Sequence, residues 1–125
     1  MLNLILLLTG SITVIVWGIA HLFPTKSVVK GFGNISDDNK NILRMEWITE
    51  GFSLIFTGVL VLSVTIAGDI ENITSVIVCI TSSVFLFSMA LLSFLTGYKV
   101  NFLPYKLCPI IFSISGILIL IGSLL

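Results

Sequence analysis

The side chains most able to do chemistry in this chain are one imidazole and two carboxylates. His21 is the only histidine, and it lies just before Pro24 at the end of an apolar segment. Glu46 and Glu50 are one helical turn apart, where the next apolar segment begins. An imidazole and a carboxylate can pair with each other or exchange a proton with a bound molecule. Because ionisable groups are costly in an apolar chain, function is expected where they meet.

The composition determines which class of protein must position these groups. Of the 125 residues, 57% are hydrophobic and 10% are charged, and the mean hydropathy is +1.20. These values exclude a soluble domain and indicate an integral membrane protein. A bilayer core about 30 Å thick requires roughly 20 apolar residues in a helix, and four stretches satisfy this length. With short connections making neighbours antiparallel, the sequence predicts an all-α antiparallel four-helix bundle in a single domain of residues 1–125. Its helices are expected at about 2–23, 36–67, 73–96 and 103–125.

The connections between these helices differ in length and charge. Pro24 ends the first helix, and the stretch from there through Gly33 is expected to form a turn. Ser36, followed by two aspartates, predicts the start of the second helix. The basic residues all lie in or beside the connections 24–44 and 97–102, at Lys26, Lys30, Lys40, Arg44, Lys99 and Lys106. The positive-inside rule therefore predicts a multi-pass protein of the cell membrane with both connections in the cytoplasm and both termini outside.

Helical geometry brings the ionisable groups to one level. The first helix runs into the cytoplasm and the second runs out of it, so His21 and Glu50 are each expected about one turn inside the boundary. Glu46 lies nearer the water, and Ser53 and Thr57 follow on the same side of the second helix. The sequence thus predicts a polar cavity that opens to the cytoplasm. Its candidate binding or proton-transfer residues are His21, Glu46, Glu50, Trp17, Tyr98, Tyr105 and Lys106.

These residues also have a structural interpretation. In it, Glu46 and Glu50 are interfacial anchors paired with nearby basic residues (Arg44, Lys40 or Lys106), and Trp47 belongs to the aromatic belt. A metal or haem centre requires more ligands than one histidine and two separate cysteines supply, so no metal and no cofactor is assigned. No run of basic residues suggests a nucleic-acid partner.

Part of the sequence resembles a known group of proteins. The first helix ends in Trp17-Gly18-Ile19-Ala20-His21-Leu22-Phe23-Pro24, and Glu50-Gly51 and Phe56-Thr57-Gly58 follow in the second. In these features the chain resembles small bacterial four-helix membrane proteins of the DoxX-like kind. The resemblance covers at most the first half and implies architecture more than function.

Three functional hypotheses follow. The favoured one is a small membrane protein of binding or accessory type, whose cavity holds a membrane lipid or another hydrophobic small molecule, or whose faces dock to a membrane-protein partner. The second is a membrane enzyme in which His21 and Glu50 exchange a proton with a lipid-soluble substrate. The third is a proton-coupled transporter that uses Glu50, which would need a homo-oligomer because four short helices enclose little volume. A non-enzymatic role is preferred.

Overall fold

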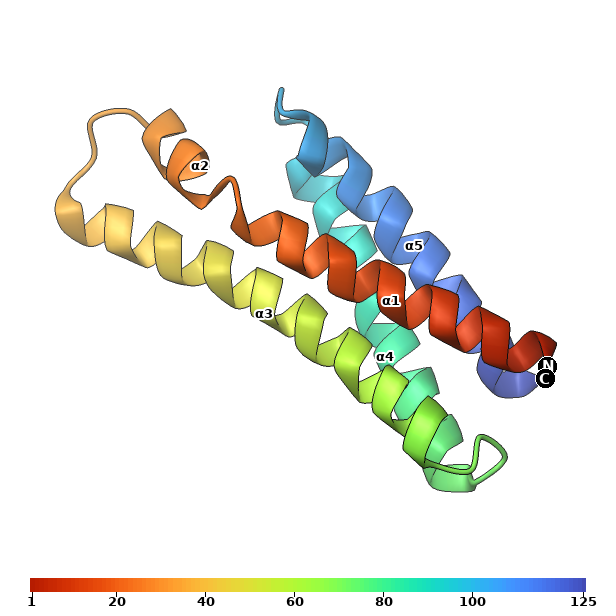
Figure 1. Ribbon diagram of the computed structural model, residues 1–125. Helices are drawn as coiled ribbons and strands as arrows, with labels where there is room; N and C mark the ends of the chain where they lie inside the picture. The colour runs from red at the N-terminus through yellow and green to blue at the C-terminus, as the bar shows by residue number, and fades with distance from the viewer.

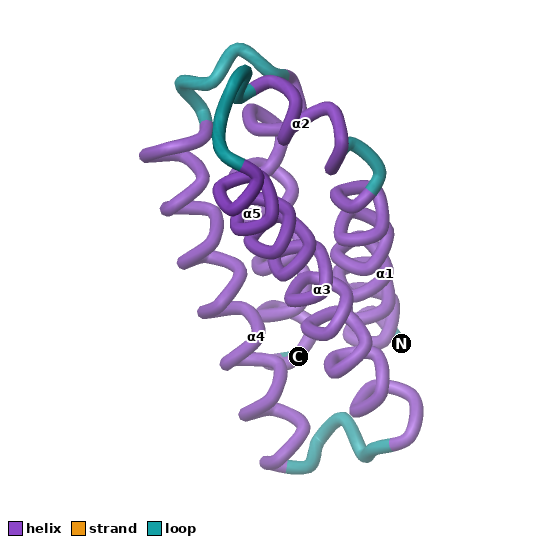
Figure 2. Tube along the Cα trace, turned by 90° about the vertical axis from the view of Figure 1, so that its left-hand side faces the viewer, coloured by secondary structure: helices purple, strands orange, loops and turns teal.

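The protein is all-helical in a computed structural model that describes residues 1–125. Four helices are long and apolar enough to cross a membrane: α1 (Leu2–Leu22), α3 (Asp37–Ala67), α4 (Ile73–Leu92) and α5 (Leu103–Leu124). A fifth helix, α2 (Thr25–Gly31), is short, and a π-helical turn (Ser93–Gly97) continues α4. Both termini lie at the end of the molecule that holds the α3–α4 connection, whereas α2 lies at the opposite end (Figures 1 and 2). The four expected apolar helices are therefore present at their expected positions.

The expected turn after Pro24 is wrong, because α2 forms there. Pro24 precedes the helix as its N-cap residue, where a missing N–H removes no helical hydrogen bond. No helix-breaking residue lies between Thr25 and Lys30, and Val29 is buried. Gly33, with a φ of 73°, ends the helix in the left-handed conformation that glycine adopts readily. Pro24 and Gly33, both expected to interrupt helical structure, thus flank a short helix.

The predicted start of the second long helix is confirmed. Ser36 is the N-cap of α3, and its hydroxyl accepts a hydrogen bond from the backbone N–H of Asn39 at 3.2 Å. Asp37 and Asp38 occupy the first turn, where negative charge is favourable. Lys40 lies 3.0 Å from the Asp37 carboxylate. Local sequence alone is therefore sufficient to begin α3 here.

Glycines allow α1 to pack closely along two neighbours. A Cβ atom at Gly18 of α1 would lie 2.9 Å from the carbonyl oxygen of Gly51 in α3, and one at Gly58 would lie 2.7 Å from that of Ser11. On the other side of α1, a Cβ atom at Gly122 of α5 would lie 3.1 Å from the carbonyl oxygen of Asn3. Such small residues let helix backbones approach where lipid supplies no hydrophobic driving force. The buried core between the helices includes Leu7, Val14, Leu54, Val61, Leu86, Phe112 and Ile119.

The packing between α3 and α4 is looser than that between the other neighbouring long helices. α4 packs along α5, but α3 and α4 contact each other only sparsely. No glycine occurs within α4, and the two glycines Gly51 and Gly58 of α3 both face α1. The α3–α4 side is therefore the loosely closed side of the molecule, and it leads to the candidate site.

Candidate functional site

The predicted imidazole and the deeper carboxylate lie together. His21 Nε2, in the last turn of α1, is 3.4 Å from Glu50 Oε2 of α3. His21 is only 6% exposed, while the Glu50 side chain is 30% exposed. The contact between Gly18 and Gly51, which brings the two backbones together one turn away, explains why these side chains can meet. The two side chains therefore meet at one level of the α1–α3 pair.

Trp47 fixes the imidazole in position. Its ring stacks on His21 with centroids 4.0 Å apart and an interplanar angle of 16°. Its indole Nε1–H donates a hydrogen bond of 2.7 Å to the His21 carbonyl oxygen. Because Trp47 is only 7% exposed, it does not belong to an exposed aromatic belt. The interpretation of Trp47 as a belt residue is wrong, and the structure adds this residue to the site.

The hydrogen-bonding capacity of His21 is incompletely used. The 3.4 Å separation from Glu50 is longer than a well-formed N–H···O hydrogen bond, and buried Nε2 has no other partner. Buried polar atoms without a partner are uncommon because they cost free energy. His21 and Glu50 therefore form a loosely coupled pair in which the buried Nε2 lacks a well-formed hydrogen bond.

A pocket of about 360 Å³ adjoins this pair. Glu46, Glu50 and Trp47 line it from α3, and Tyr105 lines it from α5. Tyr105 also contacts Trp47 edge-on, with ring centroids 5.6 Å apart. Val28 of α2 closes part of the pocket. Of the predicted site residues, His21, Glu46, Glu50 and Tyr105 are thus brought together.

Three predicted residues lie elsewhere, since they neither line this pocket nor, unlike His21, pair with a glutamate that lines it. Trp17 packs against the buried core. Tyr98 is half exposed and packs against Phe94. It follows the π-helical turn, whose wider spacing shifts the direction of later side chains from that of an α-helix. Lys106 points about 100° away from Tyr105 around α5 and pairs with neither glutamate.

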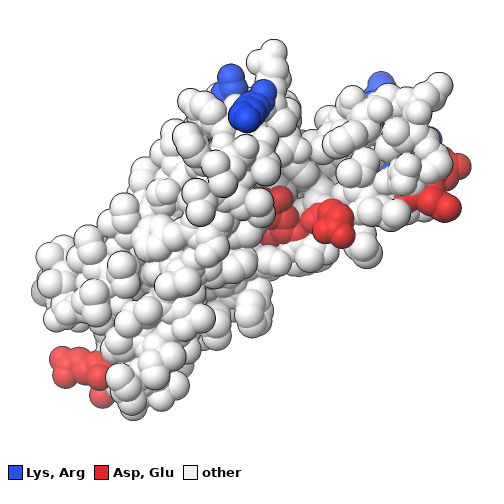
Figure 3. Space-filling model, turned by 180° about the vertical axis from the view of Figure 1, so that it is seen from behind, with Lys and Arg blue, Asp and Glu red and all other residues white.

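The carboxylates are not neutralised by basic side chains. Lys40 pairs with Asp37, and Arg44 donates to Asn41 at 3.3 Å. No Lys or Arg lies within ion-pair distance of Glu46 or Glu50. In the view of Figure 3, a patch of acidic side chains lies midway along the molecule, and no basic side chain adjoins it. The interpretation of the glutamates as paired anchors is therefore wrong.

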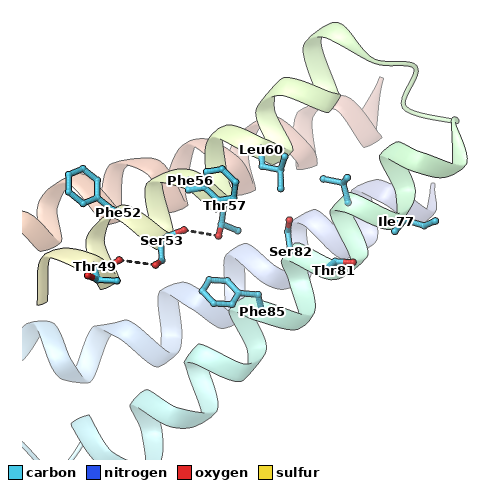
Figure 4. Close-up of a pocket in the computed structure, with 11 residues that line it drawn as sticks. Thr49, Phe52, Ser53, Phe56, Thr57, Leu60, Ile77, Thr81, Ser82 and Phe85 are labelled. Carbon is cyan, nitrogen blue, oxygen red and sulfur yellow. Dashed lines mark hydrogen bonds between the residues drawn. The ribbon is translucent and has the colours of Figure 1, made fainter. Parts of the chain in front are cut away.

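An apolar groove of about 700 Å³ continues from the pocket between α3 and α4 (Figure 4). Thr49, Ser53 and Phe85 line both the groove and the pocket. The hydroxyls of Ser53 and Thr57 donate to carbonyl oxygens one turn back in α3, at 2.8 Å each, so they do not require a partner in the groove. The rest of the lining is mainly apolar, with Phe52, Phe56, Leu60, Ile77 and Val78.

This groove was not predicted from the sequence. Ser53 and Thr57 lie on the side of α3 that is expected to carry the glutamates, but α4 does not pack closely against that side. The distribution of glycine could have indicated the groove, because α3 and α4 have no glycines facing each other and so are not expected to pack closely.

The chemistry of the site is that of a carboxylate pair with one buried imidazole beside an apolar groove. The structure brings no group of three His, Cys, Asp or Glu side chains close enough to hold a metal ion. Cys79 and Cys108 are buried free thiols. Comparison of the chain with models of protein families, with curated proteins and with solved structures found no significant match.

Proposed function

We propose that this chain is an integral membrane protein, an antiparallel four-helix bundle of binding type, which holds a lipid or hydrophobic small molecule beside Glu50. The observation that carries the proposal is that the acidic pocket and the apolar groove adjoin, since they share Thr49, Ser53 and Phe85. Sites for small molecules are typically concave, roughly 300–1,000 Å³ in volume, and mostly apolar with a few polar groups. The groove, at about 700 Å³, has this character.

The distribution of charge supports an orientation for this protein. Lys26 and Lys30 lie in α2, and Lys40 and Arg44 lie in the first turns of α3 at the same end of the molecule, whereas the α3–α4 connection carries Asp69 and Glu71. By the positive-inside rule, the pocket then faces the cytoplasm and both termini lie outside. A ligand would have its polar end near the cytoplasmic boundary and its apolar part along the groove.

The contact between His21 and Glu50 supports a second candidate function, which is proton transfer in an enzyme or a proton-coupled transporter. Binding is preferred because the long groove needs an apolar occupant, which proton transfer alone does not explain. Glu50→Gln separates the two functions. Binding of a neutral apolar molecule should persist in this variant, whereas turnover or proton flux should be lost.

Fluorescence quenching tests the proposed binding. Trp17→Phe leaves Trp47, which lines the pocket, as the single tryptophan of the two in the chain. In lipid nanodiscs, the neutral quencher 1-bromododecane should reduce Trp47 fluorescence with a saturable component. Thr81→Phe, which fills the groove, should remove that component.

Ser88→Phe is the matched control, because Ser88 is exposed on the same helix and does not line the groove. It should leave saturable quenching intact. A purely linear response that is equal in all variants would reflect partition of the quencher into the bilayer, and would contradict the proposed function. Proton movement into proteoliposomes that Glu50→Gln abolishes would instead support the transporter.

A further inference from the structure

We infer that the ligand is a single-chain amphiphile with a cationic amine head, held with its head at Glu46 and Glu50 and its chain between α3 and α4. This inference rests on the proposed function and adds the chemical class of the molecule. It depends on three separate features of the structure, which are the charge of the pocket, the unsatisfied imidazole and the shape of the groove.

The charge of the pocket selects a cation. Glu46 is exposed and Glu50 is 30% exposed at its side chain, and neither has a Lys or Arg partner. An ammonium group supplies both the opposite charge and the N–H donors that two carboxylates lack. An anionic head at the same position would meet like charges at close range, which is unfavourable.

The imidazole provides independent support for a ligand at this position. His21 is more than nine-tenths buried, its Nε2 has no hydrogen-bond partner, and this atom faces Glu50. Stacking on Trp47 keeps the ring from turning elsewhere. His21 therefore lies on the buried side of Glu50 and does not itself line the pocket, so the Glu50 carboxylate, which does line it, is the group that a donor on the ligand would reach.

Aromatic rings beside the carboxylates also suit an ammonium group. Trp47 and Tyr105 line the same pocket as the two glutamates, but Trp47 is nearly fully buried with its ring stacked on His21, so Tyr105 is the ring that an ammonium group would contact. The faces of such rings attract cations, and the attraction is strongest where water is partly excluded. An uncharged hydroxyl head would gain nothing from this property.

The groove has the length of an alkyl chain. Its lining on α3 extends to Leu60. With a rise of about 1.5 Å per residue, Leu60 lies about 21 Å along the helix from Glu46. Phe52, Phe56 and Phe85 supply apolar surface along this length. An apolar surface that extends along α3 from a charged end matches a single-chain amphiphile better than a compact molecule.

Competition between head groups tests the inference. In the Trp17→Phe background, nanodiscs of phosphatidylcholine are loaded with 1-bromododecane, and quenching of Trp47 is reversed with dodecylammonium, 1-dodecanol or dodecyl sulfate. Dodecylammonium should displace the quencher at a concentration at least about tenfold lower than dodecyl sulfate, as expected for hydrogen bonds to a charged group. In the double variant Glu46→Gln and Glu50→Gln this preference should disappear.

Glu71→Gln is the matched control, because it makes the same change at an exposed residue in the α3–α4 connection, which does not line the pocket. It should retain the preference, which separates recognition by the pocket from differences in partition among the three amphiphiles. Equal displacement by all three head groups, or a preference for the sulfate, would overturn the inference while leaving the proposed function intact. Failure of the quencher to saturate would overturn both. A dimer that dissociates on Thr81→Phe would also overturn the inference, because a second copy of the chain would then occupy the groove.

Discussion

At the residue scale, the position of one imidazole depends on one indole. Trp47 stacks on the ring of His21 and donates a hydrogen bond to the backbone carbonyl of the same residue. The hydrogen bond satisfies a carbonyl in the last turn of α1, which lacks a partner within its own helix. Trp47 therefore connects the end of α1 to α3 at the level of the site.

Substitutions of Trp47 should separate these two contributions. Trp47→Phe keeps an aromatic ring beside His21 but removes the N–H donor, and we expect it to lower the free energy of unfolding by about 1 kcal/mol. Trp47→Ala also removes the ring and leaves a cavity, and should cost roughly 3 kcal/mol or more. Thermal unfolding in detergent, followed by circular dichroism, measures both effects. An equal midpoint for the two variants would contradict the role of the stacked ring.

The rare residue types explain how much of the site was predictable. His21 and Glu50 could be identified because ionisable groups are few in this chain and helix lengths fix their depth. Trp47 could not be identified from the sequence, because a tryptophan at this position can also face lipid. Its direction depends on how α1 packs on α3. Tyr98 was misplaced because a π-helical turn has no clear sequence pattern.

At the element scale, glycine determines which helices approach closely. The α1–α3 contact depends on Gly18, Gly51 and Gly58, at each of which a Cβ atom would meet the opposite helix closely. Within the two helices the α3–α4 side has no such contacts; only Gly68, the C-cap residue of α3, comes close to α4, at Ser75. The difference between the close α1–α3 packing and the open α3–α4 side thus follows from the positions of a few small residues.

Gly58→Ala should test the close packing of α1 and α3 directly. The added methyl group would lie 2.7 Å from the carbonyl oxygen of Ser11, and a backbone atom cannot move away without shifting α1. We expect destabilisation by about 1–3 kcal/mol, as for other overpacked interiors. The midpoint of thermal unfolding in detergent should fall accordingly.

Gly31→Ala provides the control for this substitution. Gly31 also lies in a helix, but nothing is within 4 Å of the added methyl group, and its φ is not positive. Because alanine is the better helix former, this variant should be neutral or slightly more stable. If both glycine variants unfolded at the same temperature, close helix approach would not explain the effect at Gly58.

The long helices were predictable, and their pairing was not. Length and hydropathy identify α1, α3, α4 and α5, and the hydroxyl and acids at Ser36–Asp38 locate the start of α3. α2 has only seven residues, too few for a clear helical period beside the breakers Pro24 and Gly33. Rows of small residues indicate inward faces, but the choice of close neighbours depends on how all helices pack at once.

At the scale of the whole molecule, the uneven distribution of basic residues should determine orientation. Cys79 and Cys108 are buried, with 2% and 3% exposure, so cysteines introduced at exposed positions can be labelled against a low background. On intact cells, an impermeant maleimide should label Glu71→Cys and should not label Asn39→Cys. Both should react after the cells are opened. The opposite pattern on intact cells would place the basic connection outside and contradict the proposed orientation.

The loosely closed side between α3 and α4 has a consequence for how a molecule reaches Glu50. This gap runs along the middle of the two helices, from Thr49 to Leu60 on α3, so in a bilayer it would face the acyl chains. A ligand already dissolved among those chains would enter the gap by lateral diffusion within the bilayer, without first returning to water. The occupancy of the site would then depend on the number of ligand molecules per lipid. Adding empty vesicles to a fixed amount of ligand would therefore lower that occupancy.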